Sequence, residues 1–216
     1  MKTSLLILSI VIVLSSSIDL FGQGRTRSLE ISHLTGNFYV YTTYKEYEGA
    51  LIPSNSMYVV TDKGVVLFDT PWDSTQFQPL LDSIQQRYNK KVVLLIATHF
   101  HDDRTAGLNF FNQKGIATYT SKQTFDLCKM HNKNHSKYYF TKDTTFIIGN
   151  HTFQTYYPGE GHTADNIVIW CDAEKILYGG CLVKSTENFS LGNIEDANLS
   201  RWPASIKNIM TRFPKP

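Results

Sequence analysis

The sequence predicts an α+β fold in which two β-sheets pack together and helices cover the outside. Segments rich in β-branched and aromatic residues come first, strand and helix signals then alternate, and further strands precede a last helix. The chain has 216 residues, 42% of them hydrophobic, which suits one domain with a sizeable core. Its formal net charge of +2 gives no electrostatic reason to expect a nucleic-acid partner.

The elements follow in order from local patterns. Strands are expected at residues 28–33, 37–43, 57–61 and 65–69, with turns at Gly36 and at Asp62-Lys63-Gly64. A helix should follow, because Thr70 can cap it, Pro71 suits a first helical position, and an apolar stripe runs from Phe77 to Tyr88. Residues 92–97 form a continuous apolar run, which is typical of a strand covered on both faces. Helices are then expected at 104–112, 121–132 and 201–213, and strands at 144–148, 151–157, 167–171 and 175–178.

The N-terminus has the pattern of a signal peptide. Lys2 supplies the positive charge, residues 5–14 the apolar core, and residues 15–23 a small and polar exit. The apolar run is too short to span a bilayer. We therefore expect residues 1–22 to be removed, and residues 23–216 to form one periplasmic domain, a monomer without a membrane span.

Metal-capable side chains follow the apolar run at 92–97. His99 and His101 are one residue apart, so both can lie on one face of an extended segment and bind one ion. Asp103 can reach a second ion beside it. His162 and Cys181 follow Gly-rich segments further along the chain. Imidazole, carboxylate and thiolate are zinc ligands, and the spacing predicts a metal site at strand ends.

The expected ligand set favours catalysis over a structural role. Three imidazoles leave a fourth position for water, whereas structural zinc sites are usually closed by four protein ligands. Zinc lowers the pKa of bound water to about 7, so metal-bound hydroxide would be the nucleophile. Asp103 and Cys181 suit a second zinc ion, with Asp103 also able to orient the hydroxide.

The other histidines and cysteines have simpler interpretations. His131 and His135 have the spacing of a helical metal pair, but their polar surroundings favour a solvated face. The histidines and cysteines expected to be structural are His33, His151, Cys128 and Cys171. For Cys171, both burial and a disulfide remain open.

The mature chain resembles a metallo-β-lactamase of class B, first subclass. The matching motifs are Phe68-Asp-Thr-Pro-Trp-Asp73, Thr98-His-Phe-His-Asp-Asp103-Arg104, Gly161-His162-Thr163, Gly180-Cys181-Leu-Val-Lys184-Ser185, Leu191-Gly192-Asn193-Ile-Glu-Asp196-Ala197 and Trp202-Pro203. The resemblance implies an αββα sandwich, two zinc ions in a groove, and hydrolysis of the β-lactam amide bond, which confers antibiotic resistance.

The family's functional residues carry over onto matching positions. His99, His101 and His162 resemble the three-histidine zinc site, and Asp103 and Cys181 resemble two ligands of the second zinc. By the same resemblance, Lys184 pairs with the substrate carboxylate and Asn193 lies near the lactam carbonyl, while residues 44–54 match a mobile flap. From the residues alone, Lys184 would be an ordinary surface lysine and 44–54 a plain hairpin loop.

The sequence departs from the family pattern at its C-terminus. The family completes its second zinc site with a histidine beyond the helix expected here at 201–213, and this sequence has no histidine after His162. Either the sequence is incomplete or the second site lacks a ligand. We expect the first, with the C-terminal strand and helix of the family missing.

Two alternatives to β-lactam hydrolysis remain open from the sequence. One is another hydrolase of the same superfold, such as a thioesterase or lactonase. Those enzymes typically carry a second histidine directly after the motif aspartate, and an aspartate bridging the metals, where this sequence has Arg104 and Cys181. The other is a non-catalytic metal-binding fragment, against which the open three-histidine site argues.

Overall fold

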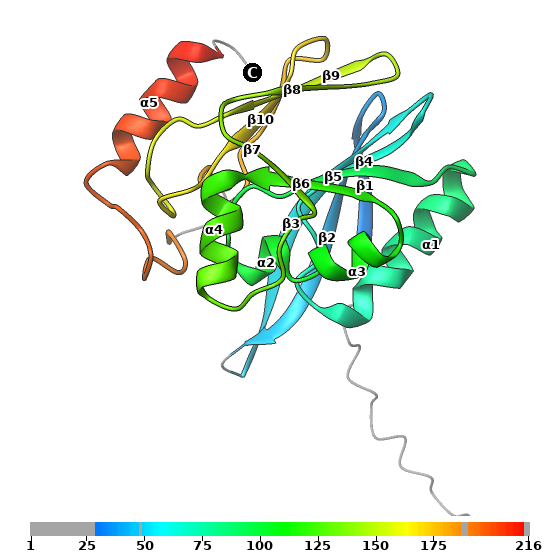
Figure 1. Ribbon diagram of the computed structural model, residues 1–216, viewed down its shortest axis with the longest axis horizontal. Helices are drawn as coiled ribbons and strands as arrows, with labels where there is room; N and C mark the ends of the chain where they lie inside the picture. The colour runs from blue at the N-terminus through cyan, green and yellow to red at the C-terminus, as the bar shows by residue number, and fades with distance from the viewer. Residues whose placement is uncertain (1–28, 48, 187–189, 214–216) are drawn as a thin grey trace, which may run out of the picture.

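Two β-sheets are stacked face to face with helices on both outer sides (Figure 1). This computed structural model describes residues 29–47, 49–186 and 190–213. The expected signal peptide at residues 1–22 lies outside the described residues. Within the described ranges, no helix combines the length and the apolar character needed to cross a membrane.

The larger sheet contains seven strands in sequential order. They are β1 (Glu30–Thr35), β2 (Phe38–Tyr47), β3 (Ala50–Thr61), β4 (Gly64–Phe68), β5 (Val92–Ile96), β6 (Ala117–Ser121) and β7 (Tyr138–Phe140). The first four strands pair antiparallel, and the pairs from β4 to β7 are parallel. The parallel strands are connected through α1 (Phe77–Tyr88), α2 (Asp102–Thr105), α3 (Leu108–Gln113) and α4 (Lys122–Met130).

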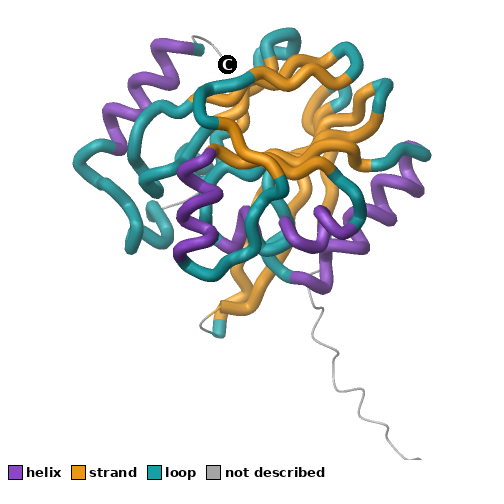
Figure 2. The backbone as a smooth tube through the Cα atoms, in the orientation of Figure 1, coloured by secondary structure: helices purple, strands orange, loops and turns teal. Residues whose placement is uncertain are grey.

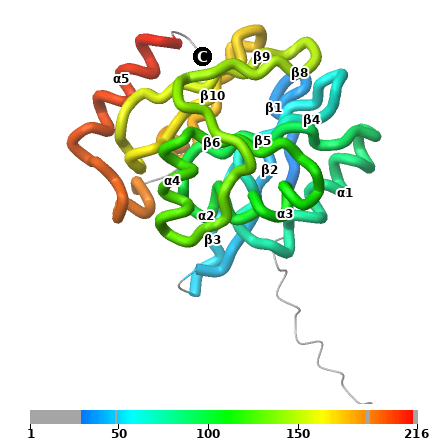
Figure 3. The backbone as a smooth tube through the Cα atoms, in the orientation of Figure 1, coloured from blue at the N-terminus to red at the C-terminus, as the bar shows by residue number. Residues whose placement is uncertain are grey.

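The smaller sheet is antiparallel, in the order β11-β10-β9-β8. Its strands are β8 (Thr145–Ile148), β9 (His151–Tyr156), β10 (Val168–Cys171) and β11 (Ile176–Tyr178), and α5 (Trp202–Arg212) lies against it. Figure 2 shows the strands as the inner layers with helices outside them. In Figure 3 the blue-to-green part of the chain builds the larger sheet, and the later part builds the smaller sheet and α5.

Alternation along the strands produces three hydrophobic layers. On β4, Val65 and Leu67 pack toward α1, whereas Val66 and Phe68 face the smaller sheet and meet Phe153. The third layer, between the smaller sheet and α5, contains Val168, Trp170, Leu182, Trp202, Ile209 and Phe213. A helix–sheet, a sheet–sheet and a sheet–helix core together make an αββα sandwich, which confirms the predicted fold class.

The helix expected to start at Thr70 begins later. Asp73 caps a short 3₁₀ helix, η1 (Ser74–Gln76), and α1 follows at Phe77. The buried Thr70 hydroxyl instead accepts a hydrogen bond from the backbone N–H of Gly107 at 3.0 Å. This bond takes the Gly107 N–H out of a continuous helix, so the expected helix at 104–112 is divided into α2 and α3.

Two further expectations differ from the structure. β6 and β7 were not expected from the sequence. The strands expected at 37–43 and 57–61 are longer than the sequence indicated, because β2 and β3 continue into the segment that resembles a flap, with Tyr44 opposite Pro53 and Tyr47 opposite Ala50. Residues 44–47 and 50–54 therefore form the paired arms of a β-hairpin, and the mobility of this flap stays a prediction.

Candidate metal centre

The first metal-capable segment leaves the end of β5. His101 has extended backbone angles and is the N-cap of α2, so Asp103 lies in the first turn of that helix. Asp69, the residue after β4, holds this segment in place through two hydrogen bonds. One of its carboxylate oxygens accepts the Thr98 N–H at 2.7 Å, and the other accepts the Thr98 hydroxyl at 3.0 Å. The segment from His99 to Asp103 is thus an extended turn followed by a helix.

Two later loops bring the other candidate ligands to the same place. His162 lies between β9 and β10, and Cys181 follows β11. The turn before Cys181 requires a glycine, because Gly180 has φ +53° and a Cβ there would lie 2.7 Å from the Thr98 hydroxyl oxygen. The Cys181 turn is therefore packed directly against the loop that carries His99.

Three imidazoles converge at this point. The ring centroids of His99, His101 and His162 lie 4.9–5.0 Å apart in all three pairs. Nδ1 of His101 is 3.2 Å from Nε2 of His162. Among the described residues, the buried Nε2 of His99 has no hydrogen-bond partner. A buried nitrogen without a partner, facing two other imidazoles, suits a cation.

Asp103 and Cys181 complete the cluster. Donor atoms of His99, His162 and Cys181 lie within 4.8 Å of one another, as do those of His99, His101 and Asp103. The Cys181 thiol donates to Asp103 Oδ2 at 3.3 Å. The structure therefore brings together all five residues that the sequence predicted as ligands. Their donor set of nitrogen, oxygen and sulfur fits zinc.

Burial lowers the pKa of the His99 and His162 imidazoles, which favours the neutral form that metal binding requires. His99 is fully buried, and this burial, together with His162 and His101, holds its pKa well below the usual value. Burial, and then the charges of Lys184 and His101, lower the pKa of His162 to about 3. Both rings are therefore ready to bind a metal at neutral pH without losing a proton.

Arg104 contacts both of the candidate ligands that are not histidines. Its Nη2 donates to Cys181 Sγ at 3.0 Å, and its Nε lies 3.1 Å from Asp103 Oδ2. Burial disfavours the Asp103 carboxylate, but Arg104 and the Cys181 hydrogen bond outweigh burial and leave its pKa lowered. Burial raises the pKa of the Cys181 thiol to about 12 despite Arg104. A bound cation would be needed to deprotonate that thiol.

The two substrate residues expected from the resemblance lie nearby on different segments. The Lys184 ammonium is 5.7 Å from the centroid of the Trp202 ring, which itself lies 5.8 Å from the His162 ring. Asn193 is exposed on the loop before α5, and its Oδ1 accepts the backbone N–H of Glu195. Among the described residues, the Asn193 side chain makes no hydrogen bond to the imidazoles.

Sequence reasoning missed two carboxylates that hold this site. Asp196 Oδ2 lies 2.8 Å from Nε2 of His101, on the ring nitrogen opposite the one that faces His162. Asp69 anchors the His99 loop through Thr98. Both residues belong to motifs that carry the family resemblance, and only the folded structure shows that they lie beside the candidate ligands.

The other histidines and cysteines lie outside the cluster. His131 stacks on Phe100 and His135 contacts Phe125, whereas His33 and His151 lie on strands. Cys128 and Cys171 are buried and free, so the disulfide considered for Cys171 is not present.

Fold and site together define a metal-binding αββα sandwich with its donor set at strand ends, and comparison with known proteins agrees. The family model of the metallo-beta-lactamase superfamily matches residues 49–206. The chain is 42% identical over 199 residues to metallo-beta-lactamase type 2 of Elizabethkingia meningoseptica, covering 92% of this chain and 80% of that protein. It is 43% identical over 182 residues to metallo-beta-lactamase IND-1 of Chryseobacterium indologenes, covering 84% and 76%.

Solved structures give the same result. The metallo-beta-lactamase from Pontibacter korlensis superposes with a TM-score of 0.84 at 38% identity, covering 87% of each chain. The metallo-beta-lactamase IND-7 superposes with a TM-score of 0.84 at 41% identity, covering 88% of each chain. This chain belongs to the metallo-beta-lactamase superfamily, and the predicted resemblance is confirmed. The family implies bound metal ions.

Proposed function

We propose that this protein hydrolyses the amide bond of β-lactam antibiotics with two zinc ions, and that it confers resistance from the periplasm. The observation that carries the proposal is the convergence of three imidazoles, Asp103 and Cys181 from three separate loops. The relatives named metallo-beta-lactamase support the choice of substrate. When bound, zinc polarises a carbonyl oxygen and lowers the pKa of water to about 7, which makes a nucleophile available at neutral pH.

The chain's own residues would bind the zinc ions and position the nucleophile. His99, His101 and His162 would hold one zinc, and Asp103 and Cys181 would hold the other. Asp103 can also accept a hydrogen bond from the nucleophile, because its lowered pKa keeps it ionised.

Two residues would bind the substrate. The Lys184 ammonium would attract the substrate carboxylate. Because Oδ1 of Asn193 already accepts the Glu195 N–H, Asn193 would turn the donors on its Nδ2 toward the lactam carbonyl.

Lys184→Ala is expected to raise KM for a β-lactam more than it lowers kcat. Anchoring a carboxylate contributes mostly uniform binding, and a charge-assisted hydrogen bond contributes about 1.5–3 kcal/mol, so kcat/KM should fall about ten- to a hundredfold. Steady-state kinetics on a β-lactam, a thioester and a lactone measure this effect and compare the substrate classes. Lys207→Ala, an exposed lysine on α5, is the matched control.

Two results would count against this proposal. An unchanged KM in Lys184→Ala would remove Lys184 from the substrate site. Faster turnover of the thioester or lactone by the wild-type protein would point to a different hydrolase.

Cys181→Ser is expected to weaken the second zinc and leave the first largely bound. Serine has a much higher pKa than a thiol and is a poor zinc ligand, whereas the three histidines are untouched. Zinc titration should show one tight equivalent and a second one weakened by about ten- to a hundredfold or more. Cys171→Ala, which removes a buried thiol between the sheets, should keep both equivalents. Two equally tight equivalents in Cys181→Ser would mean that Cys181 is structural.

A further inference from the structure

Trp202 contacts both the loop that carries His162 and the segment that follows Cys181. It begins α5, and only 6% of it is exposed. Its ring lies 5.8 Å from the His162 ring, and its Nε1 donates to the backbone carbonyl of Leu182 at 2.9 Å. The Lys184 ammonium lies 5.7 Å from the centroid of the same ring. One side chain thus reaches the His162 loop and the segment that runs from Cys181 to Lys184.

The His162 ring depends on packing in a way that the other two imidazoles do not. Histidine ligands usually hold their orientation by a hydrogen bond from the second ring nitrogen. His101 has Asp196 on its second nitrogen, and His99 has the Thr98 hydroxyl 3.3 Å from Nδ1. The buried Nδ1 of His162 has no hydrogen-bond partner within the described part of the chain. Among the described residues, the rings packed against it are those of His99, His101 and Trp202, and only Trp202 is not a candidate ligand.

The backbone around His162 is also fitted to Trp202. A Cβ on Gly161 would lie 3.2 Å from two atoms of the Trp202 ring and 2.4 Å from Leu182. The carbonyl of Gly161 accepts the N–H of Asn198, whose own carbonyl accepts the Trp202 N–H. The His162 loop and the start of α5 are thereby held at close contact.

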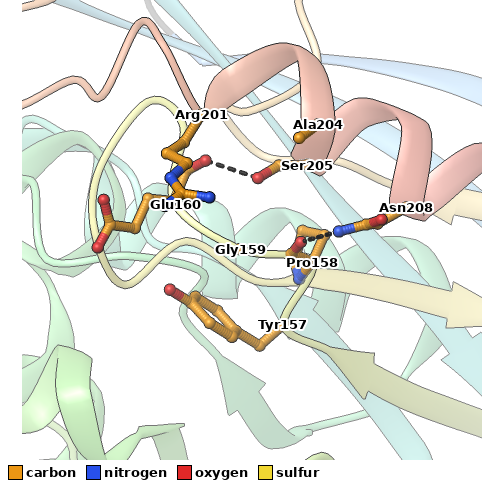
Figure 4. A pocket seen from close by; sticks show the side chains of 8 residues that line it. All are labelled: Tyr157, Pro158, Gly159, Glu160, Arg201, Ala204, Ser205 and Asn208. Carbon is orange, nitrogen blue, oxygen red and sulfur yellow. Dashed lines mark hydrogen bonds between the residues drawn. The ribbon is translucent and has the colours of Figure 1, made fainter.

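α5 holds the preceding part of the same loop as well. Figure 4 shows Ser205 and Asn208 pointing from α5 to the segment that leads to His162. The Ser205 hydroxyl donates to the Glu160 carbonyl at 2.6 Å, and the Asn208 amide donates to the Pro158 carbonyl at 2.8 Å. The helix is fixed to the loop by these bonds, so the Trp202 ring has a defined place against His162.

We propose that Trp202 is a positioning residue that sets the orientation of the His162 imidazole and, through the Leu182 carbonyl, the position of Lys184. The two contacts use different parts of the side chain. The ring face supports His162 and Lys184, and the Nε1–H fixes the turn after Cys181. They are therefore separable by substitution.

Two variants of Trp202 distinguish these contacts. Trp202→Phe keeps an aromatic face but removes the Nε1–H, leaving the Leu182 carbonyl unpaired. It should raise KM for a β-lactam roughly tenfold and change zinc affinity little. Trp202→Leu also removes the aromatic face, and it should weaken the tighter zinc equivalent by about tenfold or more. Zinc affinity is measured on the metal-free variants by competition with a chromophoric chelator.

Trp170→Phe is the matched control. Trp170 lies in the same hydrophobic cluster, is 5% exposed, and makes one Nε1 hydrogen bond, to Asp172. It stacks on Phe213, and within the described part of the chain it makes no ring contact with His162 and no hydrogen bond to Leu182. This variant should lose stability to a similar extent in a thermal melt while zinc affinity and KM stay within about twofold of wild type.

All measurements are made at a temperature where each variant is folded. Zinc affinity and KM that remain at wild-type values in both Trp202 variants would overturn the proposal. An equal loss of zinc affinity in Trp170→Phe and Trp202→Leu would also overturn it, because the loss would then follow from lower general stability. The kinetic part rests on the proposed function, but the zinc titration does not. Absence of wild-type β-lactam turnover would reject that function and leave the zinc result to decide on Trp202.

Discussion

A chelator is expected to abolish turnover of a β-lactam by this protein, and added zinc should restore it. The described residues contain a five-residue donor set for metal, and the sequence after residue 22 contains no Ser-x-x-Lys motif that would supply a serine nucleophile. Without the metal, hydrolysis should fall by several orders of magnitude, because the source of the nucleophile at neutral pH is lost. The initial rate is measured before chelation, after chelation and after zinc addition.

The control for this experiment is the fold of the metal-free protein. None of the candidate ligands belongs to the three hydrophobic layers, so far-ultraviolet circular dichroism should change little on chelation. Loss of the spectrum together with activity would mean that metal is needed for folding. Hydrolysis that resists the chelator, or an acyl-enzyme seen by mass spectrometry, would contradict metal-dependent catalysis.

The parts of the fold that follow from sequence are those where side-chain polarity reports burial. β4 and β5 are continuous apolar runs, and both are covered on two faces. β6 was missed because the side chains that it buries deepest are Thr118 and Thr120, which carry hydroxyls. The Thr120 hydroxyl pairs with that of Ser136 at 2.7 Å, so a polar residue is satisfied inside the protein. Hydrophobic periodicity cannot signal such a strand.

The candidate site likewise has residues that the sequence predicts and residues that it does not. The five candidate ligands could be predicted because the chemistry of metal binding belongs to the residue type. Asp196 could not, because its partner His101 lies 95 positions away in sequence. The predicted start of α1 was wrong for a related reason. Thr70 has the residue type of a cap, but its hydroxyl accepts a bond from Gly107, which only the folded structure brings to it.

Asp69 illustrates how much stability depends on a residue that pattern alone does not reveal. It is fully buried and has φ +63°, a conformation that aspartate tolerates better than most residues. Beside the two bonds from Thr98, its Oδ2 accepts the Tyr178 hydroxyl at 2.6 Å and lies 3.4 Å from Arg104 Nη1. Burial raises its pKa to about 6, although Arg104, Tyr178 and Thr98 all favour the carboxylate.

Asp69→Ala is expected to lower the free energy of unfolding by about 3–5 kcal/mol, because it leaves the Arg104 charge buried without this partner. The loss is a large part of a total stability of roughly 5–15 kcal/mol. Asp69→Asn keeps the size and the tolerance of positive φ, so it should lose less. Urea unfolding of the metal-free proteins measures both variants. Asp126→Ala, which breaks an exposed ion pair with Lys122, should change stability by no more than about 0.5 kcal/mol.

Substitution of Asp69 should also disturb Asp103 and Cys181, the ligands proposed for the second zinc, because Arg104 contacts Asp69, Asp103 and Cys181 together. Once the Asp69 carboxylate is removed, Nη1 of Arg104 still donates to the Asn55 carbonyl and to the hydroxyls of Ser56 and Tyr178. These partners are neutral, so the charge of the guanidinium is no longer shared with Asp69. Zinc titration of Asp69→Asn, which should remain folded, is then expected to show the second equivalent weakened by about tenfold, with the first less affected. If Asp69→Asn binds both equivalents like the wild type, Asp69 acts on the stability of the fold alone, and the ligand geometry is set by Asp103 and Cys181 without it.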